Sequence, residues 1–247
     1  MKNDVAIQFE RVTKVFGDVT VLDDVSFEVL RGQAFCILGR SGAGKSVTLR
    51  QMIGLMQPDS GSIFVQGENV GTLNSEGLTR IRKQVGFLFQ YSALFDSISV
   101  EENVAFPLRR HTRMSSREIH GRVGELLGQV GLQQHRDKMP SEISGGMRKR
   151  VGLARAMALD PSILLVDEPS SGLDPITSQE IDELLLALRR RGTTIVAVTH
   201  NIPSARRIGD KLAFLHEGRI LDSGTPQQLM NSRQELVQRF MSVEGGT

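Results

Sequence analysis

The sequence predicts an α/β fold in which helices cover a mostly parallel sheet and a helical lobe is inserted into the chain. Continuous apolar runs alternate with helical patterns in the C-terminal part, beginning with ILLVDE at 163–168 and TTIVAVTH at 193–200. Such runs are typical of strands that are buried on both faces of a parallel sheet. Residues 92–160 instead carry amphipathic helical patterns without a strong strand signal. We therefore expect this middle segment to form the inserted lobe.

Each element is predicted from the period of its apolar residues. The expected strands are residues 5–12, 25–30, 34–39, 62–67, 84–90, 162–168, 193–200 and 211–218. The expected helices begin at Lys45 and cover 116–132, 145–159, and about 175–190 and 203–208. The chain, 1–247, is expected to be a single domain with a core of 1–91 and 161–247 and a lobe of about 92–160. Residues 241–247 are expected to be frayed.

Composition excludes several classes of protein. With 30 Lys and Arg against 28 Asp and Glu, the net charge of +2 indicates neither a nucleic-acid nor an anionic-membrane partner. The basic clusters at 148–150 and 189–191 lie in helical patterns, so we interpret them as solvated helix faces. The single Cys36 excludes disulfides and metal–thiolate sites, and no apolar run is long enough to span a bilayer. The N-terminus lacks the apolar stretch of a signal peptide, so a cytoplasmic globular protein is expected.

The segment GRSGAGKS at 39–46 matches the pattern G-x-x-x-x-G-K-[ST] between a predicted strand and a predicted helix. Glycines in such a loop permit the tight turn whose N–H groups surround phosphates. Lys45 is expected to reach the β- and γ-phosphates of a nucleotide, and the Ser46 hydroxyl is expected to ligate Mg²⁺. The predicted nucleotide-binding residues of this segment are Gly39, Arg40, Ser41, Gly42, Ala43, Gly44, Lys45, Ser46 and Val47.

Two adjacent acidic residues, Asp167 and Glu168, end the apolar run ILLVDEP. In open α/β sheets, ligands bind outside the carboxyl ends of the strands. Asp167 is therefore a predicted metal ligand, and Glu168 is a predicted general base that polarises the attacking water. Taken alone, the pair could equally be the start of a solvated loop, and the phosphate-binding loop upstream favours the functional interpretation.

With these motifs the chain resembles the nucleotide-binding subunits of ATP-binding-cassette (ABC) transporters over nearly its whole length. The resemblance implies a P-loop NTPase core with an additional N-terminal antiparallel β region, and ATP with Mg²⁺ as cofactors. It implies that Phe16 stacks on adenine and that Gln90, in FLFQ, contacts Mg²⁺ and links the site to the lobe. It also implies that Asp174, in SSGLD, belongs to the D-loop and that His200 contacts the γ-phosphate. The alternatives are an ordinary core aromatic for Phe16 and a capping or core residue for His200.

The segment ISGGM at 143–147 raises a separate question, because it places Ser144, Gly145 and Gly146 before a basic helix. N–H groups at a helix start favour an anion, although a serine N-cap with flexible glycines is the simpler interpretation. The segment resembles the ABC signature LSGGQ, which receives the γ-phosphate of ATP held by the opposite subunit. The resemblance therefore implies a second copy of the chain, arranged head to tail. Ile143 and Met147 depart from the signature, and activity is expected to survive both changes.

Local features at 88–112, 139–156 and 167–178, together with Met147, resemble the ATPases of Mla/MCE-type lipid transport systems. This resemblance implies integral-membrane permease subunits, an MCE-domain lipid-binding protein and a position at the inner face of the cytoplasmic membrane. The expected function is ATP hydrolysis that powers lipid transport, with phospholipid as the expected cargo. The alternatives are an importer of a polar solute such as an amino acid, a non-transport ABC ATPase, and a regulatory module without turnover.

A groove bordered by residues 90–110 is expected to receive a short helix of the permease. Its expected apolar anchors are Tyr91, Leu94, Phe95 and Phe106, and Glu101, Glu102 and Arg109 are expected at the rim. The apolar set is larger than a solvated connector needs. The alternative is that these side chains pack the lobe's own core.

Overall fold

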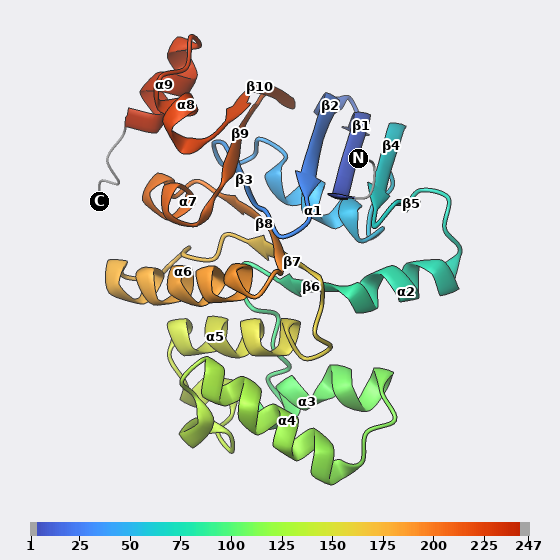
Figure 1. Ribbon diagram of the computed structural model, residues 1–247, viewed down its shortest axis with the longest axis vertical. Coiled ribbons are helices and arrows are strands. Elements are labelled where there is room, and N and C mark those ends of the chain that lie inside the picture. Colours follow the sequence, from blue (N-terminus) through green and yellow to red (C-terminus); the bar gives the residue numbers. More distant parts are fainter. Residues whose placement is uncertain (1–3, 243–247) are drawn as a thin grey trace.

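Six strands form the larger sheet of the computed structural model, which describes residues 4–242 (Figure 1). Their order is β10-β9-β3-β8-β7-β6, so that β3 (Ala34–Leu38) lies between β9 and β8. The others are β6 (Val85–Leu88), β7 (Ile163–Asp167), β8 (Thr194–Thr199), β9 (Lys211–His216) and β10 (Arg219–Gly224). β3 pairs in parallel with β8 and β9, and β7 pairs in parallel with β6 and β8. The predicted, mostly parallel sheet is confirmed.

Both faces of this sheet are covered, because successive side chains of a strand point to opposite faces. Phe35 and Ile37 of β3 join an apolar cluster with the helix α1 (Lys45–Met52) and the N-terminal strands. Cys36 and Leu38 join a second cluster with α6 (Pro175–Arg190) and α7 (Ile202–Ile208). Cys36 is fully buried there, and this burial raises the pKa of its thiol.

A second, antiparallel sheet has the order β2-β1-β4-β5. It consists of β1 (Val5–Phe16), β2 (Val19–Leu30), β4 (Ser60–Val65) and β5 (Glu68–Asn69). β1 and β2 extend beyond the expected 5–12 and 25–30 because they form a long hairpin, whose turn has Gly17 at a φ of 56°. The stacked rings of Phe9, Phe27 and Phe35, with centroids 4.5 and 5.1 Å apart, join this sheet to the larger one.

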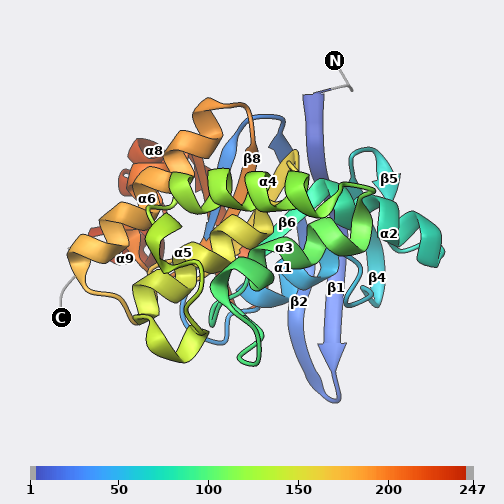
Figure 2. The ribbon, with the colours of Figure 1, turned by 90° about the horizontal axis from the view of Figure 1, so that it is seen from below.

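Helices α3 (Val100–His111), α4 (Ser116–Gln129) and α5 (Gly145–Ala156) lie together at one end of the molecule, opposite α8 and α9 (Figures 1 and 2). They share an apolar cluster that includes Val104, Leu108, Val123, Leu127 and Val151. Capping boxes at Ser99 and Ser115 begin α3 and α4. Short 3-10 turns at Gln133–His135 and Pro140–Glu142 connect α4 to α5. The expected helices 116–132 and 145–159 end three residues early, at turns with Gly131 and Asp160 at positive φ.

Several elements had no counterpart of their own among the predicted ranges, including β5 and, within the expected helical lobe, α3. Helix α2 (Ser75–Gln84) buries only Gly77 and Ile81, and the edge strand β10 has no apolar run. Helices α8 (Pro226–Met230) and α9 (Glu235–Ser242) are short, and α9 packs Phe240 on Phe214 with ring centroids 4.7 Å apart. The expectation of a frayed tail from 241 is wrong for Met241 and Ser242, because Met241 is buried in the second apolar cluster, and residues 243–247 lie outside the described range. Across 4–242, no helix has both the length and the apolar character needed to cross a membrane.

Candidate active site

The loop between β3 and α1 requires glycine at several positions. Gly42 and Gly44 have φ angles of 82° and 97°, in the region where glycine has no steric penalty. A Cβ at Gly44 would lie 2.8 Å from the carbonyl oxygen of Val21, and one at Gly39 only 2.3 Å from that of Leu215. The loop is therefore packed closely against its surroundings at Gly39 and Gly44. At Gly42 it is open, because a Cβ there would meet nothing within 4 Å. This is the shape that allows a phosphate group to approach the backbone N–H groups.

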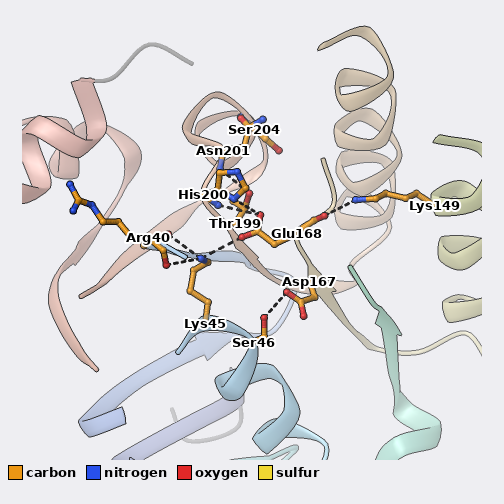
Figure 3. A network of polar contacts seen from close by, with 11 residues as sticks. Arg40, Lys45, Ser46, Lys149, Asp167, Glu168, Thr199, His200, Asn201 and Ser204 are labelled. Atoms are coloured by element: carbon orange, nitrogen blue, oxygen red, sulfur yellow. Dashed lines mark hydrogen bonds and ion pairs between the residues drawn. The ribbon is translucent and has the colours of Figure 1, made fainter. Parts of the chain in front are cut away.

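Lys45 is held within this loop (Figure 3). The residue is only 6% exposed, and its Nζ donates to the carbonyl oxygens of Gly39 (3.0 Å) and Arg40 (3.1 Å). It also lies 3.4 Å from Oε1 of Glu168. The ammonium group is thus positioned at the loop by three oxygen atoms, one of them charged.

Asp167 ends β7 opposite the first turn of α1. The Ser46 hydroxyl donates to Asp167 Oδ1 at 2.9 Å, which brings together two of the three predicted metal ligands, and the third, Gln90, lines the same cleft. Burial raises the pKa of Asp167, and the hydrogen bond from Ser46 partly opposes this shift. Carboxylate and hydroxyl oxygens fit Mg²⁺, which is usually bound by one or two carboxylates plus substrate phosphates and waters. Residues 4–242 contain no group of three or more His, Cys, Asp or Glu that could hold a metal ion.

Glu168 follows in an unusual backbone conformation. Its φ is 47°, and its N–H donates to the carbonyl oxygen of Val198 in β8 at 2.9 Å. Glu168 is only 7% exposed. Its carboxylate lies between Lys45 and His200, and Oε2 is 2.9 Å from Nδ1 and 3.3 Å from the backbone nitrogen of His200. Backbone strain of this kind persists where the surrounding structure holds it, and it clusters at functional sites. The arrangement fixes a carboxylate where it can accept a proton from a bound water.

These groups line an open cleft of about 680 Å³. The predicted residues that line it are Arg40, Ser41, Gly42, Gly44, Lys45, Ser46, Val47, Gln90, Glu168 and His200. Sequence reasoning missed Val21, Ile202 and Phe240, which also line it. Their apolar side chains form no motif, and Phe240 reaches the cleft only through the packing of α9. No sequence signal would have identified them.

Several predicted residues are not among those that line the cleft. Phe16 is 44% exposed, and the Nζ of Lys14 lies 5.3 Å from its ring centroid, so it is not the core aromatic of the alternative interpretation. Gly39 and Ala43 belong to the phosphate loop, and Asp167 reaches the site through Ser46. The remaining predicted residues outside the lining are Ser144, Gly145, Gly146 and Asp174.

The last four residues lie at two neighbouring helix starts. Ser144 caps α5 by accepting from the N–H of Met147 at 3.2 Å, and Asp174 caps α6 by accepting from the N–H groups of Ile176 and Thr177. A Cβ at Gly146 would lie 2.4 Å from Thr177 Cγ2, so glycine permits the close contact between the two starts. Their donors are brought together, but away from the chain's own cleft.

The comparison with known families decides the assignment: the model of the ABC transporter family matches residues 22–171. The chain belongs to this family. The matched segment of the ABC cassette contains the phosphate loop, Gln90, the signature and the acidic pair. As a member of the family, the cassette is an ATPase that uses ATP with Mg²⁺.

Three relatives match almost the whole ABC cassette. The probable ribonucleotide transport ATP-binding protein Mkl of Mycobacterium leprae is 41% identical over 98% of this chain and 70% of its own length. The methionine import ATP-binding protein MetN of Caulobacter vibrioides is 39% identical over 97% of this chain and 73% of its own length. The protein TRIGALACTOSYLDIACYLGLYCEROL 3, chloroplastic, of Arabidopsis thaliana is 38% identical over 96% and 74%.

Among solved structures, the cassette is similar to a dimeric ATP-binding cassette in a post-hydrolysis state with bound ADP and Pi. The TM-score is 0.83 at 33% identity, and the match covers 89% of this chain and 98% of the other. The predicted ABC-type fold and the ATPase assignment are therefore confirmed.

Proposed function

We propose that this ABC ATPase powers the transport of phospholipid between membranes of the cell envelope, bound to a membrane permease on the cytoplasmic side and working with an MCE-domain lipid-binding protein. The observation that carries the cargo assignment is the signature ISGGM, in which Met147 replaces glutamine, together with the segment 88–112. Both are similar to the ATPases of Mla/MCE-type systems. The Arabidopsis relative is named after a galactolipid, which agrees with a lipid cargo.

In the proposed cycle, the loop N–H groups and Lys45 bind the β- and γ-phosphates, and Phe16 stacks on the adenine. Glu168 accepts a proton from the attacking water, while His200 orients that carboxylate and contacts the γ-phosphate. When bound through Ser46, Asp167 and Gln90, Mg²⁺ neutralises charge on the phosphates. The arrangement that supports these roles is the carboxylate of Glu168 between Lys45 and His200.

We further propose that the cassette works as one domain, with a core of 1–91 and 161–247 and a lobe of about 92–160, and as a head-to-tail pair with a second copy. The N–H groups after Ser144 would then bind the γ-phosphate held by the partner, and Asp174 would lie at the same interface. The support is geometric, because the start of α5 does not line the chain's own cleft. Donors at a helix start need an anion, and the second copy supplies one.

Mixing two inactive variants tests this trans arrangement. Ser144→Arg is expected to obstruct the partner's γ-phosphate and Lys45→Ala to disable the chain's own phosphate loop, so that each preparation alone has background ATPase activity. A mixed pair contains one intact site, formed by the phosphate loop of the Ser144→Arg chain and the signature of the Lys45→Ala chain. We expect ATPase activity, measured as phosphate release, to reappear when the two variants are mixed. Lys45→Ala alone at the same total protein concentration is the control and should stay at background. If every mixing ratio gives only background activity, one intact site formed between two chains is not sufficient for turnover, and the proposal in this form is contradicted.

A groove beside the lobe supports the proposed contact with a permease. It has a volume of about 540 Å³ and lies where α3, α2 and the segment after β6 meet. Phe95 and Phe106 line it, are 44% and 47% exposed, and contact each other with ring centroids 4.9 Å apart. Tyr91 is 87% exposed but lies outside the lining, and Leu94 instead packs against the lobe's cluster. Of the four predicted anchors, two therefore line the groove, one packs in the lobe core and one, Tyr91, does neither.

None of the three predicted rim residues, Glu101, Glu102 and Arg109, lines this groove. Glu101 pairs with Arg136 inside the lobe, and Glu102 closes the capping box of α3, so both carboxylates are used locally. Arg109 is exposed and is not part of the lining. The charged or titratable lining residues are instead Arg82, Lys83, His111 and Arg155. Burial and the nearby Lys83 lower the pKa of His111, so the cations of the lining are Arg82, Lys83 and Arg155. A groove with two exposed aromatic rings and these cations favours a partner helix with apolar anchors and a carboxylate.

Replacing Phe95 with aspartate is expected to uncouple the ATPase from the permease. The residue is 44% exposed, so the isolated chain should fold with about the wild-type stability. It should also keep its ATPase activity, because Phe95 does not line the nucleotide cleft. A carboxylate at the groove would remove the apolar anchor and repel the acidic partner helix, and co-purification with the permease should be lost. Leu30→Asp, at a position 45% exposed in β2, is the matched control and should still co-purify. If Phe95→Asp unfolds, the ring belongs to the core; if it assembles and transports normally, the docking site lies elsewhere.

The cargo itself is tested by purifying the tagged ATPase from membranes in mild detergent and identifying what accompanies it by mass spectrometry. A permease, an MCE-domain protein and bound phospholipid would support the proposal. A solute-binding protein with a permease would instead favour the second candidate, a polar-solute importer, for which the 39% identity to MetN is the specific observation. Reconstituted vesicles then decide between the two by ATP-dependent transfer of labelled phospholipid or of methionine.

A further inference from the structure

Lys149 crosses from the helical lobe to the catalytic segment after β7 (Figure 3). It belongs to the second turn of α5, and the residue is only 5% exposed. Its Nζ donates a 2.8 Å hydrogen bond to the backbone carbonyl oxygen of Glu168. The cassette motifs assign no role to this side chain, although it contacts the residue whose carboxylate is the proposed general base.

This hydrogen bond is one of three that hold the backbone of Glu168. The N–H of Glu168 donates to Val198 in β8 at 2.9 Å, and its carbonyl oxygen also accepts from the N–H of Ser171 at 3.2 Å. A φ of 47° is unfavourable for a residue with a Cβ, so the conformation depends on such contacts. Because the side chain of Glu168 leaves from this backbone, a change in these contacts would move the carboxylate relative to Lys45 and His200.

The chemistry of Lys149 argues against a purely structural role. Burying an ammonium group is costly, and burial lowers the pKa of Lys149 to about 8, while the nearby carboxylates of Glu168 and Asp167 partly oppose this shift. Apolar side chains of similar volume can often replace a buried ion pair at no cost in stability, and Lys149 bonds a neutral carbonyl oxygen that also accepts from Ser171. A methionine would pack in the same space without the cost. The cation is therefore better explained by what its hydrogen bond does than by stability.

We propose that Lys149 is a positioning residue that transmits the orientation of the helical lobe to Glu168. Two residues near the start of α5 support this: Ser144 caps the helix at the proposed contact with the partner's nucleotide, and Lys149, in the second turn, reaches the chain's own Glu168. A movement of α5 on engaging the partner's nucleotide would then reset the backbone of this chain's general base. The inference rests on the proposed roles of Glu168 and of the head-to-tail pair.

The test compares four full-length variants, Lys149→Met, Lys149→Arg, Lys138→Met and Glu168→Gln, by steady-state ATPase kinetics with Mg²⁺. Lys149→Met is expected to lower kcat by roughly tenfold, equivalent to about 1.4 kcal/mol of transition-state stabilisation, with KM for ATP changed less than about twofold. Lys149→Arg keeps a charged donor and should restore most of kcat. Lys138→Met makes the same change at an exposed lysine of the lobe and should behave as wild type. Thermal unfolding of Lys149→Met is expected close to the wild-type temperature, because the carbonyl oxygen of Glu168 keeps its bond from Ser171.

The outcomes separate this inference from the proposed function. A normal kcat for Lys149→Met, while Glu168→Gln is inactive, would overturn the positioning role alone. A loss that Lys149→Arg does not repair, or one that appears in KM instead of kcat, would also overturn it. Retained turnover in Glu168→Gln would overturn the role of the general base, and the inference about Lys149 with it.

Discussion

Glu168→Gln is expected to lower ATP turnover by at least about 100-fold, the lower bound for removing a general base, without weakening ATP binding. The amide is nearly the same size as the carboxylate and can still accept from the backbone N–H of His200, so the geometry of the cleft should persist. It cannot, however, take a proton from water. Loss of the negative charge beside Lys45 also removes a competitor for that cation. Turnover is measured by phosphate release and affinity by a nucleotide titration.

The same variant should accumulate as an ATP-bound pair. Because ATP lies between two subunits in the proposed arrangement, a chain that binds ATP but does not hydrolyse it keeps the pair closed by mass action. Size-exclusion chromatography with ATP and Mg²⁺ is expected to show a dimer that reverts to monomer when ATP is removed. Glu76→Gln, at an exposed position in α2, is the matched control and should hydrolyse ATP normally. Only monomers at high protein concentration with ATP would count against the dimer mechanism.

A strand or helix could be predicted from the sequence where the burial of its residues produces a clear local pattern of apolar side chains. Strands β3, β7 and β8 were predicted because every residue in them is buried, which produces an uninterrupted apolar run. The hairpin β1–β2 was predicted too short, since half-buried positions interrupt its pattern beyond Val12. Helix α2, with Ile81 as its one fully buried large side chain, has too few apolar residues to be recognised from their period. Helix α9 does carry a helical period, at Leu236, Val237, Phe240 and Met241, and it was missed because it spans only about two turns.

The candidate site follows the same division between local and tertiary information. Residues 39–46 and the acidic pair are contiguous motifs, so their residue types and spacing were sufficient to predict them. The pairing of Ser46 with Asp167 required knowledge that the two segments meet, which the order of parallel strands made foreseeable. The hydrogen bond from Lys149 to the carbonyl oxygen of Glu168 was not predicted, because a backbone acceptor forms no sequence motif. In addition, the basic cluster at 148–150 is interpreted from the sequence as a solvated helix face. For Lys149 that interpretation is wrong, because its aliphatic stem and ammonium group lie between the lobe and the core.

Lys45→Ala is expected to weaken ATP binding itself, by roughly 10- to 100-fold, as hydrogen bonds to charged groups contribute about 1.5–3 kcal/mol each. Lys45 is 6% exposed and carries its charge at the loop that surrounds the phosphates, so no solvent cation can take its place with the same geometry. The change also leaves Glu168 without a cation 3.4 Å from its carboxylate, and that uncompensated charge would repel the γ-phosphate.

Affinity is measured by titrating a fluorescent ATP analogue with Mg²⁺ present. Lys138→Ala, which truncates an exposed lysine of the lobe, is the control and should bind as wild type. An unchanged dissociation constant for Lys45→Ala, in a variant that unfolds at the wild-type temperature, would show that the loop N–H groups hold the nucleotide without the lysine.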